Sequence, residues 1–179
     1  MSRTASMYLE LLHIVFVIQQ IDLKIIPDIY ELSGCPGHDY HMDFSDVEFS
    51  YDDDGYLTVN GNFTFLRDVV APYPAYIYSE RLEQGEWRPA IITKSVPDFC
   101  AVIQNPMEVW YPVTRQLNKK NCPYKAGFVG RIDNVRYSFP VPITPNFLGE
   151  WRVFLEQRDI TKETEEYACL VQYFSVIDI

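Results

Sequence analysis

The chain has 179 residues, of which 47% are hydrophobic and 15% aromatic, and its formal net charge is −10. A chain of this length suits one domain, and it can bury a core without help from a metal. The acidic balance argues against nucleic acid as a partner, because phosphates need a basic surface.

An apolar run at residues 11–18 follows a segment that carries Arg3. This length suits the hydrophobic region of a signal peptide and is far too short for a transmembrane helix. Glu10 and His13 weaken that pattern, and a buried first strand is the alternative interpretation. We expect a signal peptide at 1–20, and an extracellular product without an integral membrane segment.

Two strands are expected early in the domain, at 24–32 with an interruption at Pro27 and at 44–51. The acidic run Asp52-Asp53-Asp54-Gly55 comes next. As a calcium loop it would need flanking helices and a later bidentate glutamate, and both are missing. An Asp-Gly turn of a β-hairpin explains the run better.

The segment 56–66 alternates most regularly and predicts a strand with one apolar face. That face carries Leu57, Val59, Gly61, Phe63 and Phe65. The opposite face carries Thr58, Asn60, Asn62 and Thr64. Asn62-Phe63-Thr64 is also an N-glycosylation acceptor sequence, so we expect Asn62 to face water and to carry a glycan.

Strands are also expected at 75–82 and 87–96, before a stretch that does not alternate. Within that stretch, residues 98–109 have apolar side chains at helical spacing, and Asp98 is a suitable N-cap. Two cysteines bracket it. We therefore predict a tethered helix-and-loop crossing between two blocks of strands.

Three strands follow the crossing, at 126–139, 149–157 and 167–177, with a proline-rich connector at 140–145. Seven or eight short strands separated by turns are typical of an antiparallel β-sandwich. No repeat or linker divides the chain. The expectation is an all-β fold in a single domain at 21–179.

The cysteines are Cys35, Cys100, Cys122 and Cys169. An even number behind a signal peptide predicts two disulfides, and four cysteines allow three pairings. The spacing Cys35-x-x-His38-x-x-His41 raises the alternative of a zinc site, but a fourth ligand is missing at the usual spacing.

The sequence contains no catalytic constellation. It has three histidines, no nucleophile elbow and no phosphate-binding glycine loop. Cys100 is better explained by a disulfide than as a nucleophile, and the carboxylates cluster in turns. We expect a protein that is not an enzyme and uses no cofactor or metal.

Large apolar side chains are the remaining feature. Such rings either fill the core or line a cleft between splayed sheets, and the pattern alone does not choose. The candidates for an apolar binding site are Leu57, Val59, Phe63, Phe65, Trp110, Tyr111, Phe128, Trp151 and Val153.

Five short segments resemble the insect CheB-type chemosensory proteins, relatives of the ganglioside activator protein and of the ML lipid-recognition superfamily. They are 56–64, 85–89, 98–100, 121–124 and 148–153. The likeness covers roughly residues 30 to 179, and it rests on the order and spacing of the segments.

The resemblance implies an immunoglobulin-like β-sandwich opened into a cup, secretion, no catalysis, and binding of a lipid between the sheets. It also implies the pairings Cys35–Cys169 and Cys100–Cys122. The ganglioside activator has more disulfides than four cysteines can make. Its lipid-contacting positions carry no transferable motif, so our site residues come from alternation.

Two functions follow as hypotheses. The first is a secreted monomeric carrier of a lipid or other hydrophobic small molecule, such as a pheromone or cuticular lipid in chemosensation. The alternative is an extracellular protein-interaction module, with a filled core, that serves a receptor or activates a hydrolase. A closed core or an apolar cavity would distinguish the two.

Overall fold

The computed structural model describes residues 25–53, 56–137, 144–159 and 166–178. The expected signal peptide at 1–20 lies outside these residues, as does most of the proline-rich connector. Eight strands are present in the described part: β1 Ile25–Gly34, β2 Met42–Tyr51, β3 Leu57–Phe65, β4 Ala75–Glu83, β5 Glu86–Val96, β6 Val129–Tyr137, β7 Gly149–Asp159 and β8 Glu166–Asp178.

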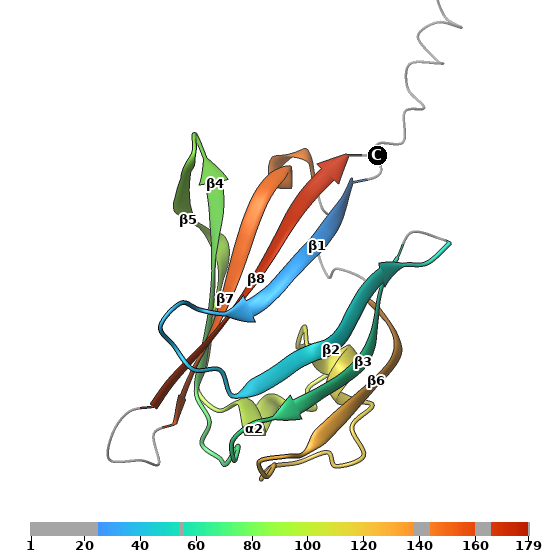
Figure 1. Ribbon diagram of the computed structural model, residues 1–179, viewed down its shortest axis with the longest axis vertical. Coiled ribbons are helices and arrows are strands. Elements are labelled where there is room, and N and C mark those ends of the chain that lie inside the picture. Colours follow the sequence, from blue (N-terminus) through green and yellow to red (C-terminus); the bar gives the residue numbers. More distant parts are fainter. Residues whose placement is uncertain (1–24, 54–55, 138–143, 160–165, 179) are drawn as a thin grey trace, which may run out of the picture.

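The strands form two antiparallel sheets that lie as two layers (Figure 1). The larger sheet has the order β1-β8-β7-β4-β5, and the smaller has the order β2-β3-β6. All their pairings are antiparallel. The expected antiparallel β-sandwich is therefore confirmed.

The sequence predicted an interruption of the first strand at Pro27, and this prediction was wrong. β1 continues through Pro27, which pairs with Val176 of β8. β1 is the edge strand of its sheet. A proline, which has no N–H to donate, is tolerated on an edge because one side of the strand has no neighbour.

The crossing between β5 and β6 contains two one-turn helices, α2 Phe99–Val102 and α3 Tyr111–Thr114. Asp98 caps α2 as predicted, since its side chain accepts a hydrogen bond from the backbone N–H of Cys100. The single longer helix expected over 98–109 does not form. Pro106 disfavours helical geometry at Asn105, which ends the first helix early.

Both disulfides implied by the resemblance are present. Cys35 pairs with Cys169, with Cα atoms 5.3 Å apart, and Cys100 pairs with Cys122, with Cα atoms 5.6 Å apart. The first joins the end of β1 to β8. The second ties α2 to the loop that leads into β6.

The sandwich has two ends, named here for what they carry. At the hairpin end β2 turns into β3, and at the crossing end β5 leads into α2 (Figure 1). The main core cluster joins the smaller sheet, the loop between β3 and β4, the crossing and one buried residue of the larger sheet. Its members are Met42, Val59, Phe63, Phe65, Val69, Tyr73, Ile103, Leu117, Tyr124, Ile132, Val135 and Leu170.

Candidate functional site

The candidate site is the interior at the hairpin end, where the inner faces of the two sheets meet. On the smaller sheet, the register places Tyr51, Leu57 and Tyr137 in one row across β2, β3 and β6. The next row inward contains Phe49 and Val59, with Val135 completing it. Because strand side chains alternate, both rows point to the same face.

The larger sheet presents a matching surface. Leu155 and Leu170 are paired across β7 and β8 and belong to the main core or pack against it, which identifies the inner face. By alternation, Val153 also lies on that face, and the paired Trp151 and Phe174 lie on it closer to the hairpin end. Trp151 and Val153, both predicted site residues, therefore share one side of β7.

Trp151 is held rigidly on this inner face. The residue is 3% exposed, and its ring stacks against Phe147 and Phe174, with ring centroids 5.7 and 6.3 Å away. Its Nε1–H donates to the carbonyl of Phe147 at 2.7 Å. The guanidinium of Arg81 lies over the ring, 5.4 Å from its centroid. These contacts fix the orientation of the indole on the inner face of the larger sheet.

Several other inner-face side chains at this end are only partly buried. On the smaller sheet these are Val47, Phe49 and Tyr137, and on the larger sheet they are Val153 and Phe174. The opposing apolar surfaces thus remain partly accessible. Other inner-face side chains at this end, such as Val59 and Trp151, are buried. At the crossing end Phe63 and Phe65 are almost fully buried.

Two tyrosines of the outermost row have perturbed acidity. Burial raises the pKa of Tyr137 to about 12. Burial, with a smaller contribution from the negative charge of Asp28, raises the pKa of Tyr51 to about 12. Each phenol therefore stays neutral well above physiological pH, and a neutral phenol can donate a hydrogen bond.

The hydroxyl of Tyr51 has a second distinguishing property. Its oxygen is shielded from solvent and has no hydrogen-bond partner among the residues that the structure describes. A buried polar group without a partner is costly, and natural proteins rarely leave one. Tyr124, which is also buried, does have a partner, because its hydroxyl donates a hydrogen bond to the carbonyl of Lys119 at 3.1 Å.

Three of the predicted site residues lie at the crossing end instead. Phe63 and Phe65 are almost fully buried in the main core. The ring of Phe65 lies 5.0 Å from that of Tyr124 and 6.0 Å from that of Phe128, which packs against the same core. These side chains are part of the packed core at the crossing end.

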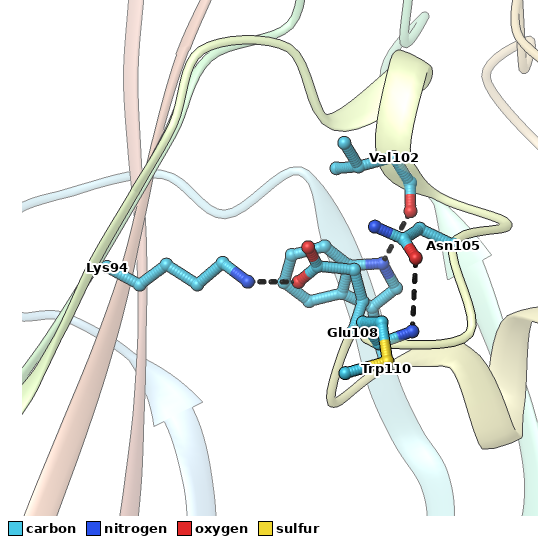
Figure 2. Close-up of polar contacts among 6 residues, drawn as sticks. Lys94, Val102, Asn105, Glu108 and Trp110 are labelled. Atoms are coloured by element: carbon cyan, nitrogen blue, oxygen red, sulfur yellow. Dashed lines mark hydrogen bonds and ion pairs between the residues drawn. The ribbon is translucent and has the colours of Figure 1, made fainter.

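Trp110 and Tyr111 belong to the crossing and not to a strand. Figure 2 shows Trp110 beside Lys94, which makes an ion pair with Glu108. The ammonium of Lys94 lies 5.4 Å from the centre of the Trp110 ring. The indole Nε1–H points to the carbonyl of Val102 at 3.4 Å. Trp110 therefore fastens the crossing to β5.

The zinc alternative finds no support in the described residues. Cys35 is consumed in a disulfide. The Nδ1 atom of buried His41 is hydrogen-bonded to the hydroxyl of Tyr73 at 2.5 Å. Across the described ranges, no group of three or more acidic, histidine or cysteine side chains is arranged to hold a metal.

The predicted hairpin between β2 and β3 is confirmed, although Asp54 and Gly55 lie outside the described residues. The Asp52 N–H donates to the Tyr56 carbonyl at 3.0 Å, and the Tyr56 N–H donates to the Asp52 carboxylate at 2.8 Å. The Asp52 carboxylate is also paired with Arg136. The Asp52 carboxylate therefore stabilises the turn between β2 and β3.

The two faces of β3 are as predicted. Leu57, Val59, Phe63 and Phe65 are buried, and Asn62 is exposed. Thr58 lies on the outward face yet is buried, because Ser50 covers it and the two hydroxyl oxygens are 2.7 Å apart. The side chain of Asn62 is accessible to a glycan.

An aromatic cluster on the outer face of the larger sheet was not identified from the sequence. The rings of Tyr78 and Phe154 stack at 4.7 Å, and the guanidinium of Arg152 lies 4.5 Å from the centre of the Trp87 ring. Glu80 pairs with Arg152. The alternating aromatic and charged residues of β4 and β7 could have revealed this second apolar face.

The fold and its contacts define a disulfide-bonded antiparallel β-sandwich. No family model matches the chain, and no curated protein matches it significantly. In the described part, no helix is long and apolar enough to cross a bilayer. Two disulfides are characteristic of chains that fold in an oxidising compartment.

Proposed function

We propose that the protein is a secreted, non-enzymatic carrier that binds a lipid or other hydrophobic small molecule between its sheets. The observation that carries this proposal is the set of partly buried apolar side chains that face each other at the hairpin end, represented by Phe49 and Val153. Ligand pockets are mostly apolar with few polar groups, and this interior has that composition.

The energetics fit a flexible apolar ligand. Burying an acyl chain contributes about 0.8 kcal/mol per methylene. Ten methylenes would contribute on the order of 8 kcal/mol before ordering losses, comparable with micromolar affinity. Secretion is supported by the two disulfides and by the apolar run at 11–18. The resemblance to chemosensory and lipid-recognition proteins supports the same function.

A binding experiment tests the proposal. The fluorescence of N-phenylnaphthylamine should rise when the protein is added, and a fatty alcohol should displace the probe. The variant Phe49→Ala should change the affinity for the probe while the protein stays folded. If the probe does not bind and no lipid can be extracted from the purified protein, the carrier function is wrong.

The alternative of a protein-interaction module is favoured by a different observation. The cluster of Tyr78, Trp87, Arg152 and Phe154 covers the outer face of the larger sheet with partly exposed side chains. Aromatic and arginine side chains are enriched at protein interfaces. Trp87→Ala would weaken a partner complex without altering probe binding, which separates the two functions.

A further inference from the structure

We propose that Tyr51 donates a hydrogen bond to a neutral oxygen-bearing head group of the apolar ligand, such as an alcohol or a carbonyl. This inference rests on the proposed carrier function and adds to it the chemistry and the orientation of the ligand. The head group would lie at the hairpin end, and the chain would extend toward the crossing end.

The position of Tyr51 fits this role. It is the last residue of β2, in the outermost row of the smaller sheet, and it pairs with buried Leu57. The rows below it are apolar and lead through Phe49 to the main core. A ligand that buries its chain along those rows brings its polar end to the level of the Tyr51 hydroxyl.

Among the described residues, the Tyr51 hydroxyl has no acceptor. No described residue is hydrogen-bonded to the Tyr51 oxygen, although that oxygen is shielded from water. An acceptor supplied by a ligand would satisfy it. Discrimination by a buried hydrogen-bonding group is strong, because an analogue without the matching atom leaves that group unpaired.

The charges near this end favour a neutral head group over a carboxylate. Asp28 lies on the edge strand β1, where it pairs with Ser175 of β8, and its negative charge acts on Tyr51. That charge would disfavour an anionic head group at the Tyr51 hydroxyl. The neighbouring cations are already engaged. Arg81 donates to the carbonyls of Asn146 and Leu148, and Arg136 pairs with Asp52.

The test uses the full-length protein and displacement of N-phenylnaphthylamine by decanol and by decanoate. Decanol should displace the probe from the wild type at lower concentration than decanoate does. Tyr51→Phe should weaken decanol binding about three- to tenfold, the range expected for one hydrogen bond. The affinity of the probe, which has no oxygen, should stay unchanged.

Two further variants sharpen the test. Asp28→Asn should improve decanoate binding and leave decanol binding unchanged. Tyr76→Phe is the matched control, because its hydroxyl lies on the exposed outer face beside Thr93. It should change neither ligand. Tyr51→Phe should melt at the wild-type temperature or above, since it removes an oxygen that has no described partner.

The outcomes separate the two proposals. If the probe and decanol bind but Tyr51→Phe binds decanol as the wild type does, the head-group inference is wrong and the carrier function stands. Decanoate binding more tightly than decanol would overturn the preference for a neutral head group. If neither the probe nor decanol binds, both the carrier function and this inference are wrong.

Discussion

The two ends of the sandwich are built from the same strands but differ in what packs between the sheets. At the crossing end, Phe65 and Tyr124 stack within a closed core, and both disulfides lie there. At the hairpin end, Phe49 and Phe174 remain partly buried. The cluster at the crossing end includes Ile103, Leu117 and Tyr124, so the crossing segment itself supplies part of the core there.

The disulfides should produce the largest effect on stability. Replacing Cys35 and Cys169 with serine removes a loop of sequence separation 134, for which the chain-entropy model gives about 5 kcal/mol. Replacing Cys100 and Cys122 removes a separation of 22, for which it gives about 3 kcal/mol. Denaturant unfolding measures both, and equal losses would contradict this ranking.

Truncating one phenylalanine at each end tests the contrast directly. Phe65→Ala should cost about 3–5 kcal/mol, as is typical of a close-packed core position. Phe49→Ala should cost less, about 1–2 kcal/mol, because its side chain loses less buried area. Equal costs in chemical denaturation would mean that the hairpin end is packed as tightly as the crossing end.

Alkaline titration examines the two tyrosines of the outermost row, Tyr51 and Tyr137. The pKa values of Tyr51 and Tyr137 are raised to about 12, from an ordinary value of 10.0. Since the unfolded chain ionises first, these neutral phenols stabilise the fold below about pH 10, and this contribution is lost as the pH rises toward about 12.

Phenolate absorbance measures this titration. Tyr137→Phe should remove one late-titrating phenol and leave that of Tyr51. Tyr76→Phe, at an exposed position, should leave both late phenols in place. Titration of every tyrosine below pH 11 would show that the outermost row is open to water.

Asn62→Gln should have the smallest effect on stability. The side chain is exposed on the outward face of β3, so its replacement should stay within about 0.5 kcal/mol of the wild type. In protein secreted from eukaryotic cells, the mass should fall by one glycan. An unchanged mass would contradict glycosylation at this site.

The alternating strands could be predicted from the sequence because the physics that sets them is local. The period of two in β3 assigned Phe63 and Phe65 to the interior and Asn62 to the surface, and the structure agrees. Asp98 was recognised as a cap for the same reason. The extent of α2 differs from the prediction because Pro106 interrupts the apolar spacing that indicated a longer helix.

The candidate site could be predicted only in part, since it depends on which strands become neighbours. The sequence identified Leu57 and Trp151 as inward-facing, but no local pattern shows that Tyr51 aligns with Tyr137 across β3. The same limit explains Trp110, whose contact with Lys94 depends on where the crossing lies against β5.

The three tryptophans report on three separate regions and allow the most direct test of the carrier function. Trp151 lies on the inner face at the hairpin end, Trp110 in the crossing and Trp87 on the outer face. Three variants would each retain one tryptophan, with the other two replaced by phenylalanine, and would be titrated with a brominated fatty alcohol. Bromine quenches only nearby indoles. The carrier account predicts saturable quenching of the variant that retains Trp151, while quenching confined to Trp87 or Trp110 would contradict it.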